Sequence, residues 1–348
     1  MQAVHVNGKW LAQKLTGTQR YAGEIVQAIV AAGCFDMVLH VPADARVPDW
    51  ADAPCVTVRR SRFTGVVFEQ VYLPVAAAGK LLLNFAGPAP MLKRRQLVTM
   101  HDATPFRYPR TYRRTFVAFY FAMYGLLGRT AEILSTVSHF SASELSRALH
   151  ISGERFLVAG CAADALHAIS PTRPDLDLKG DEYLVVGTQA QHKNLAGPLA
   201  AIAASGRNVV VVGVAGSQQV FSSMPALERT AVICGRLTDA ELAWLYRNCR
   251  GLIFPSKYEG FGLPPLEAQT LGCPVVCSQA ASLPEVCGDG ALYFDPDDTE
   301  SLVAQLDRLE SEAGLADVMR NRGLANSRRY SWNASAQQVI ERVCRGAS

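Results

Sequence analysis

The stretch from Phe254 to Glu267 reads FPSKYEGFGLPPLE, and the order of its residue types predicts a strand, a loop and a helix. The apolar run at 251–254 is typical of a short buried strand. Gly260 and Gly262 free the backbone of the loop that follows, and Pro265 suits the first turn of a helix. A strand joined to a helix in this way is a repeating unit of parallel α/β sheets.

The loop and the start of this helix form a predicted binding site for a diphosphate. Unpaired N–H groups and the positive end of the helix dipole bind phosphate with little need for a metal ion. Two carboxylates bracket the loop, because Glu259 precedes it and Glu267 is expected in the first helical turn. One carboxylate could accept charge-assisted hydrogen bonds from a sugar hydroxyl and the other from a ribose diol.

Short β-branched runs alternate with longer amphipathic runs along the whole chain, which predicts an α/β protein with parallel sheets. In the first half the expected strands are 3–7, 37–41, 81–84, 96–100, 133–137 and 156–158. In the second half a strand begins at Tyr183, and further strands are expected at 208–212, 232–234, 251–254 and 274–277. Helices are expected there at 195–204, 239–247 and 265–271.

The length of 348 residues predicts two domains, since single cores stop growing at roughly 250 to 300 residues. A polar segment at 170–182 is the expected linker, which gives a first domain of 1–170 and a second of 171–330. Ligands bind at the carboxyl ends of the strands in such sheets, so we expect two doubly wound sheets facing a central cleft. The hydrophobic fraction of 49% and the charged fraction of 19% indicate a globular enzyme.

The cysteines and the N-terminal sequence favour a cytoplasmic protein. Nine scattered cysteines do not resemble the disulfide framework of a small secreted domain. The first residues enter a strand without the pattern of an export signal. The apolar stretch from Phe116 to Gly128 is flanked by arginines and is about five residues short of a membrane-spanning helix.

Positive charge is concentrated in the first half of the chain. Residues 1–170 contain 18 Lys and Arg against 11 Asp and Glu, whereas the rest contains 16 against 20. The arginines and lysines cluster at 59–62, 93–95 and 107–114. They could attract an anionic membrane face or a pyrophosphate-bearing acceptor, or they could form an ordinary solvated surface.

The string EGFGLPPLEA resembles the E-x(7)-E signature of a large family of retaining GT-B glycosyltransferases, called group 1 or family 4, which contains many bacterial mannosyl-, glucosyl- and rhamnosyltransferases. The resemblance implies two Rossmann-like domains. It places Glu259 beside the donor sugar and Glu267 on the nucleotide ribose. The other donor-binding residues implied in this string are Gly260, Phe261, Gly262 and Leu263.

Several other segments resemble the same family in the expected order. VGTQAQHKN, at 186–194, resembles the basic motif that grips the donor phosphates and implies that Lys193 binds the diphosphate. The chain departs from that motif at His192, where many relatives have an arginine, and at Thr188, where some relatives have another. Arg236 could replace the missing cation, or it could be a surface residue before a helix capped by Thr238 or Asp239.

The first half carries further matches. TMHD and a proline at 99–105 resemble the segment whose histidine lies near the reacting carbon, which implies catalytic roles for His101 and Asp102. TGTQRY at 16–21 resembles the glycine loop that opens the first helix, where Gly17 lets the backbone approach a substrate. EQVYLP at 69–74, Asn84 and TVSHFSASEL at 136–145 are acceptor-side or structural. The tail resembles a final helix, about 331–348, that returns to the first domain and is anchored by Trp332.

The resemblance implies a metal-independent, retaining hexosyltransferase that needs no cofactor beyond its nucleotide-sugar substrate. GDP-mannose is the expected donor, and UDP- and dTDP-sugars are the alternatives. The expected acceptor is a glycan or a polyprenyl-diphosphate-linked oligosaccharide in O-antigen or exopolysaccharide synthesis, with peripheral contact at the inner membrane face and no nucleic-acid partner. The aromatic segment FVAFYFAMYGLL either contacts that lipid or is a buried helix.

Other functions fit the residues less well. A nicotinamide dehydrogenase requires G-x-G-x-x-G after the first strand, where only Gly8 and Gly17 occur. Asp295 and Asp297 have the spacing of a metal site but are expected in a surface turn. Cys273, Cys277 and Cys287 have an unusual spacing for zinc and are expected to be buried thiols. A non-catalytic scaffold with a degenerate fold and a nucleotide-sugar epimerase remain as alternatives.

Overall fold

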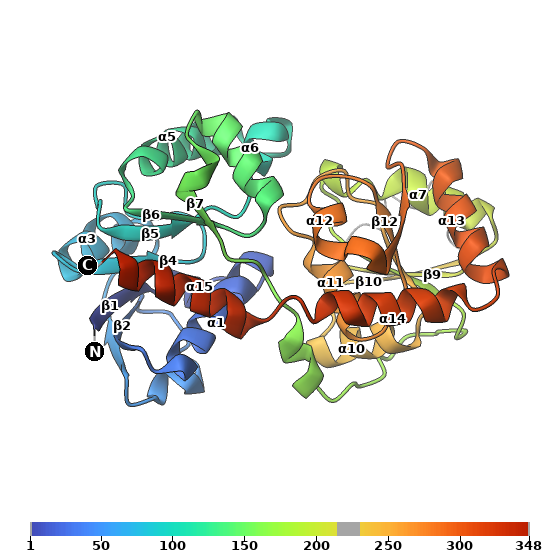
Figure 1. Cartoon of the computed structure of the whole chain (residues 1–348), viewed down its shortest axis with the longest axis horizontal. Coiled ribbons are helices and arrows are strands. Elements are labelled where there is room, and N and C mark those ends of the chain that lie inside the picture. Colours follow the sequence, from blue (N-terminus) through green and yellow to red (C-terminus); the bar gives the residue numbers. More distant parts are fainter. Residues whose placement is uncertain (1, 214–229, 347–348) are drawn as a thin grey trace. The chain divides into compact units, whose positions relative to one another are not determined.

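The computed structural model describes residues 2–213 and 230–346 of the chain. They form two compact units, drawn in Figure 1. The first unit contains Met1–Cys161 together with Trp332–Ser348, and the second contains Ala162–Ser331. Each unit has its own parallel sheet and is described by itself.

The first unit contains a seven-stranded parallel sheet in the order β3-β2-β1-β4-β5-β6-β7. Its strands are β1 Gln2–Asn7, β2 Phe35–Val41, β3 Val56–Arg60, β4 Leu81–Asn84, β5 Gln96–Thr99, β6 Ile133–Thr136 and β7 Phe156–Val158. The strand order reverses between β1 and β4, which makes this pair the switch point where ligands bind in doubly wound sheets.

The second unit contains a six-stranded parallel sheet in the order β10-β9-β8-β11-β12-β13. Its strands are β8 Tyr183–Val186, β9 Val209–Val212, β10 Ala231–Cys234, β11 Leu252–Phe254, β12 Val275–Ser278 and β13 Ala291–Phe294. Here the order reverses between β8 and β11. The prediction of two Rossmann-like, doubly wound sheets is therefore confirmed.

Helices connect the strands in both units. In the first unit they are α1 Gly17–Ala32, α2 Gly65–Val67, α3 Leu73–Ala76, α4 Thr104–Arg107, α5 Arg114–Thr130, α6 His139–Leu149 and α15 Trp332–Arg345. In the second unit they are α7 Ala196–Ala204, α10 Asp239–Asn248, α11 Leu263–Thr270, α12 Leu283–Cys287, α13 Thr299–Ser311 and α14 Leu315–Ser327. In the first unit, α5 and α6 cover one face of the sheet while α1 and α15 cover the other (Figure 1).

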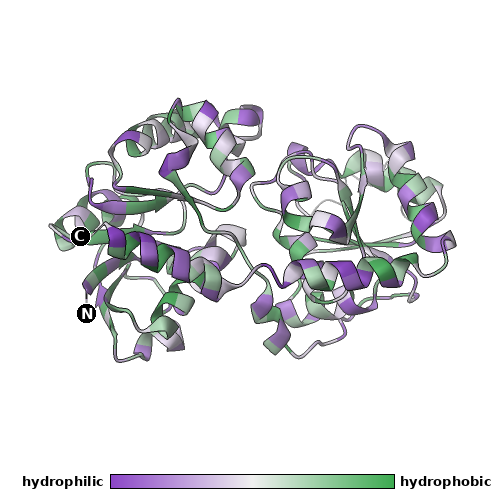
Figure 2. Ribbon diagram, viewed as in Figure 1, coloured by the Kyte–Doolittle hydropathy of each residue, from purple (hydrophilic) through white to green (hydrophobic). Residues whose placement is uncertain are grey.

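Most strand residues are hydrophobic, whereas hydrophobic and hydrophilic residues are interspersed along the helices (Figure 2). In the first unit Met123 and Leu127 of α5 pack with Leu134 of β6 in one buried cluster. In the second unit Leu199 of α7 and Leu306 of α13 pack over Val211 of β9. Burial on both faces explains why the central strands are mostly apolar along their length.

The first unit ends at Cys161, earlier than the expected domain end at residue 170. The reason is that the segment after Cys161 packs on the second unit. A short 3-10 helix, Asp164–Ala168, contacts α11, and the amide of Thr172 donates a 3.0 Å hydrogen bond to the carbonyl of Ala240. Polar composition at 170–182 therefore marks a surface segment of the second unit.

The C-terminal helix α15 packs against α1 in the first unit. Trp332, at its first turn, is 5% exposed and lies edge-on to Tyr21 with ring centroids 5.7 Å apart. The hydroxyl of Ser335 donates a 2.8 Å hydrogen bond to the carbonyl of Gly160. These contacts hold α15 against α1 and against the segment that follows β7.

Two strands were not predicted from the sequence. The edge strand β3 reads VTVRR and is mostly exposed, so it lacks the apolar signal of a buried strand. The other is β13, which has four residues. Within the described ranges, no helix combines the length and the hydropathy needed to span a bilayer.

Candidate functional site

The second unit brings Lys193 and Glu259 together at its switch point. Lys193 lies in the loop that leaves β8, and Glu259 lies in the loop that leaves the neighbouring strand β11. Parallel neighbours end at the same edge of the sheet, so these two loops are adjacent. Nζ of Lys193 donates a hydrogen bond to Oε1 of Glu259 at 2.7 Å.

Both side chains of this pair remain partly accessible, with 21% of Lys193 and 12% of Glu259 exposed. The ammonium group also lies 5.8 Å from the centroid of the Phe254 ring. One oxygen of Glu259 and two N–H bonds of Lys193 are left over from the contact between the two residues. The pair can therefore present both an anionic acceptor and a cationic donor to a ligand.

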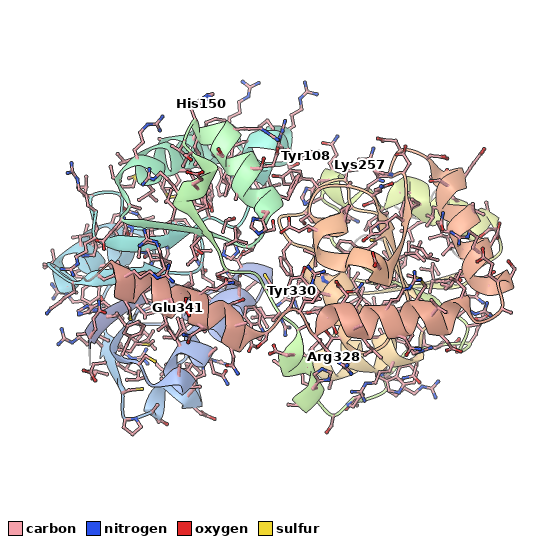
Figure 3. All side chains as sticks on the ribbon, viewed as in Figure 1. Tyr108, His150, Lys257, Arg328, Tyr330 and Glu341 are labelled. Carbon is pink, nitrogen blue, oxygen red and sulfur yellow. The ribbon has the colours of Figure 1, made fainter. Side chains whose placement is uncertain are left out.

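The two loops are fixed to each other by backbone contacts. Asn194 adopts a left-handed conformation with φ of 52°, and its side-chain amide donates to the carbonyls of Pro255 at 3.2 Å and Pro296 at 2.8 Å. The amide of Lys257, labelled in Figure 3, donates to the carbonyl of His192 at 2.8 Å. These bonds hold the Lys193 backbone against the glycine loop.

The glycine loop has a shape that only glycine permits at one position. Gly262 has φ of 99°, and a Cβ atom there would lie 2.6 Å from Cδ2 of Leu283. The buried hydroxyl of Ser282 shares its one hydrogen between the carbonyls of Glu259 at 3.0 Å and Phe261 at 2.8 Å. Backbone freedom at Gly262 and these hydrogen bonds together set the position of Glu259.

Helix α11 begins at Leu263, two residues before the expected start, and the next two residues are prolines. Pro264 and Pro265 have no N–H group, so the first turn offers fewer amide donors than an ordinary helix start. In the described part of the chain the amides of Gly262 and Leu263 have no recorded acceptor. These two amides and the helix dipole are what this end of α11 offers a phosphate.

Glu267 is not in the first turn of α11, as expected from the sequence, but begins the second turn. It is 7% exposed, and its Oε2 accepts a 2.9 Å hydrogen bond from the hydroxyl of Tyr246 in α10. Tyr246 was not predicted as a site residue from the sequence. In the sequence Tyr246 is only an aromatic residue at an apolar position of a helix. Its hydrogen bond to Glu267 joins two different helices and has no local sequence signal.

Phe261 has a packing role in the loop. Its side chain is 6% exposed and meets the ring of Tyr330 edge-on, with centroids 5.6 Å apart and planes at 90°. Tyr330 is labelled in Figure 3. Gly260 precedes Phe261 in the loop, and Leu263 is the first residue of α11. The predicted donor-binding residues of this loop therefore lie in one continuous segment.

Arg236 lies apart from this group. It follows β10, the edge strand, which is separated from β8 by β9. Its side chain is exposed and makes no recorded ion pair or hydrogen bond with the described residues. The helix that follows is capped by Thr238, whose hydroxyl accepts from the amide of Glu241 at 3.2 Å. The structure thus leaves the role of Arg236 as a prediction.

In the first unit His101 follows β5 and is held by the loop after β4. Nε2 of His101 donates to the carbonyl of Phe85 at 2.8 Å, and its ring meets Tyr21 edge-on with centroids 5.0 Å apart. Burial lowers the pKa of His101. The imidazole is therefore neutral near pH 7, with a hydrogen on Nε2 and a lone pair on Nδ1.

Asp102 uses one carboxylate oxygen to accept a 2.7 Å hydrogen bond from the amide of Thr104, at the start of α4. Gly17 is the first residue of α1, and a Cβ atom there would meet nothing within 4 Å. Neither packing nor backbone strain in this unit requires a glycine at position 17. Its proposed contact with a substrate remains a prediction.

The alternative metal sites take up structural roles. Asp295 accepts a 2.9 Å hydrogen bond from the amide of Asp297, which itself pairs with Lys257. Cys273, Cys277 and Cys287 are buried, free thiols. In the described ranges, no group of three or more His, Cys, Asp or Glu residues has the arrangement of a metal site.

Comparison with known proteins gives consistent matches. A family model described as glycosyl transferases group 1 matches residues 170–325. O-antigen chain mannosyltransferase B of Escherichia coli is 30% identical over 263 residues, which cover 71% of this chain and 69% of that protein. O-antigen chain mannosyltransferase RfbU of Salmonella typhimurium is 28% identical over 237 residues, covering 66% of this chain and 65% of that protein.

The fold also matches solved structures. Sucrose-phosphate synthase from Thermosynechococcus elongatus aligns over the full length of both chains with a TM-score of 0.78 and 19% identity. At this identity the match concerns the fold alone. It agrees with the two doubly wound sheets described above.

Proposed function

The chain belongs to the group 1 glycosyl transferases, and on this premise we propose that it transfers mannose from GDP-mannose to a glycan in surface polysaccharide synthesis. The family resemblance seen in the sequence is thereby confirmed. The relatives named as O-antigen chain mannosyltransferases support mannose as the sugar. The observation that carries the proposal is the Lys193 to Glu259 contact beside the glycine loop at the switch point of the second unit.

We assign the donor to the second unit. The ammonium of Lys193, the amides at the start of α11 and the dipole of that helix would neutralise the departing diphosphate. Glu259 would accept hydrogen bonds from hydroxyls of the donor sugar. Glu267, held by Tyr246, would accept hydrogen bonds from the ribose diol.

Retention of configuration is part of the proposal. The bond between the anomeric carbon and the phosphate oxygen breaks, and the acceptor oxygen bonds to the same face of that carbon. The acceptor's proton passes to the leaving phosphate oxygen, so no enzyme nucleophile and no metal ion are required. We also propose catalytic roles for His101, which is neutral and fixed through Nε2, and for Asp102.

The decisive experiment mixes the protein with GDP-mannose, UDP-glucose or dTDP-rhamnose and octyl α-mannoside, with and without EDTA. We expect mannosyl transfer from GDP-mannose alone, unchanged by EDTA, and an α-linked product by NMR. Transfer from a different nucleotide sugar would replace the donor assignment. A product of inverted configuration or a loss of activity in EDTA would contradict the mechanism. A donor converted without any acceptor would indicate an epimerase.

Helix α5 supports a further part of the proposal, which is contact with an anionic membrane surface from a cytoplasmic location. No charged residue occurs between Arg114 and Arg129, and Phe119 and Leu126, which lie seven residues apart on one side of the helix, are each 40% exposed. Arginines at 110, 113, 114 and 129 flank this segment in the sequence and are exposed. Apolar side chains bordered by cations bind the interface of anionic bilayers. The free cysteines agree with a reducing compartment.

Vesicle sedimentation tests the membrane contact. We expect the protein to sediment with vesicles rich in phosphatidylglycerol and to stay in solution with pure phosphatidylcholine. Replacing Phe119 and Leu126 with serine should abolish sedimentation, while Val318→Ser, at a 43% exposed apolar position on α14, should not. Equal sedimentation of the α5 variant and the unmodified protein would refute this role for α5.

A further inference from the structure

We propose that Lys9, held in place by Glu69, binds the hydroxyl groups of a neutral sugar at the acceptor's growing end. This inference rests on the proposed function, because it describes that reaction's acceptor. It uses a segment, Glu69 to Pro74, that the donor site does not involve.

Lys9 stands at the switch point of the first sheet. It follows β1, and its amide donates a 3.1 Å hydrogen bond to Oδ1 of Asn7, the last residue of that strand. Nδ2 of Asn7 in turn donates to Oδ1 of Asn84, the last residue of β4, at 3.0 Å. The carboxyl ends of β1 and β4 thus fix Lys9 where ligands bind in this class of sheet.

The side chain of Lys9 is oriented by a buried carboxylate. Nζ of Lys9 lies 2.6 Å from Oε2 of Glu69, whose side chain is only 2% exposed. Oε1 of Glu69 accepts a 2.7 Å hydrogen bond from Nε2 of Gln70, so both carboxylate oxygens are occupied. Lys9 is 17% exposed, and no second acceptor for its ammonium group is recorded in the described part of the chain. Two ammonium N–H bonds therefore remain for a ligand.

Glu69 and Gln70 belong to a π-helical turn, Phe68–Tyr72, between α2 and α3. π-Helical turns are rare in proteins, and those that occur are often found at functional sites. The turn places Gln70 so that its Nε2 donates to the carbonyl of Ala89 at 3.1 Å and its Oε1 accepts from the amide of Met91 at 3.0 Å. The same turn therefore holds Lys9 and the loop that follows β4.

The charges around Lys9 favour a neutral ligand. Glu69 compensates the ammonium charge, and Tyr120 of α5 lies within the electrostatic influence of both Asp102 and Glu69. Burial, followed by these two carboxylates, raises the pKa of Tyr120 to about 12. A phosphate at Lys9 would be repelled by the carboxylate of Glu69, whereas a sugar hydroxyl can accept a hydrogen bond from the ammonium without adding negative charge. This combination fits a polyol.

Saturation-transfer NMR on the full chain tests the site with the methyl α-glycosides of mannose, glucose, galactose and N-acetylglucosamine. We expect at least one glycoside to bind, and about 50 mM inorganic phosphate to leave its signal unchanged. The double variant Lys9→Met/Glu69→Gln, which leaves no unpaired buried charge, should lose that signal. Lys9→Arg should retain it. Arg107→Met/Glu144→Gln, which removes another ion pair with a carboxylate that is 4% exposed, should also retain it.

Three results of the binding experiment would overturn the inference: no glycoside bound by the unmodified protein, binding that survives the loss of Lys9 and Glu69, or competition by phosphate. The proposed function fails separately, through the absence of GDP-mannose binding or transfer. If transfer occurs, the double variant should raise the acceptor KM by about tenfold or more. Its donor KM and the melting-temperature rise with GDP should not change. A raised donor KM would assign Lys9 to the donor and contradict our assignment.

Discussion

Lys193 and Glu259 form a 2.7 Å hydrogen bond between two loops that are far apart in the sequence. The contact combines a cation suited to a diphosphate with an anion suited to sugar hydroxyls. Each residue partly neutralises the charge of the other. Replacing Lys193 or Glu259 with an uncharged residue therefore changes the charge that a bound donor experiences. The two residues should therefore affect donor binding in opposite ways.

We predict that Glu259→Gln keeps or improves the affinity for GDP, because Lys193 is released from its anionic partner. The same change should lower kcat with GDP-mannose by about a hundredfold or more, since it removes a contact to the sugar. Lys193→Met should weaken GDP binding about tenfold. Calorimetry with GDP and initial rates measure these effects, with the exposed Arg308→Met as control. Weaker GDP binding in Glu259→Gln would contradict the roles assigned here.

Tyr246→Phe should act on the donor through Glu267. The Tyr246 hydroxyl lies 2.9 Å from Oε2 of Glu267, and both residues are buried. Removing it takes a donor away from a buried carboxylate, which costs about 1 to 3 kcal/mol of folding free energy. A loosened Glu267 should also raise the donor KM several-fold, while the acceptor KM stays constant. Equal KM values in the variant and the unmodified protein would show that Glu267 does not depend on Tyr246.

Several site residues could be predicted from the sequence because their signal is local. The strand, glycine loop and helix at 251–271 depend on neighbouring residues, and the predicted helix ends lie within two residues of the observed ones. Tyr246, Ser282 and Asn194 were missed because their roles depend on partners in other loops. The Lys9 to Glu69 pair likewise joins distant segments. Pairings of this kind require the folded arrangement.

Acid should destabilise the first unit through a buried histidine pair. Nδ1 of His5 lies 2.8 Å from Nε2 of His40, whose Nδ1 lies 3.1 Å from the hydroxyl of Tyr72. Burial, then the nearby His5 and Arg59, lower the pKa of His40 to about 3, and burial also lowers the pKa of His5. The unfolded chain binds these protons near pH 6.5, whereas the folded chain resists them. Stability is therefore complete above about pH 6.5 and is lost as the pH falls toward 3.

The slope of unfolding free energy against pH in that window should approach about 1.4 kcal/mol per pH unit for each such histidine. His40→Gln, which can hydrogen-bond but does not titrate, should flatten the curve between pH 6.5 and pH 4. His167→Gln, at an exposed histidine, should leave it unchanged. Denaturant unfolding at a series of pH values measures the slope. An unaltered slope in His40→Gln would show that other groups cause the acid sensitivity.

Gly262→Ala should be costly for two separable reasons. The residue has φ of 99°, and the added methyl group would lie 2.6 Å from Cδ2 of Leu283. Gly314 offers a matched control, because its φ is 77° and a Cβ atom there meets nothing within 4 Å. Gly314→Ala should therefore cost only the backbone strain, about 1 to 2 kcal/mol, and should leave activity intact. Gly262→Ala should cost more, because Leu283 must also move, and it should reduce kcat by displacing Glu259.

Chemical denaturation measures the stability losses of the two variants, and initial rates measure their kcat values. Equal stability losses in the two variants would mean that Leu283 yields freely, and full activity in Gly262→Ala would mean that the loop does not set the position of Glu259.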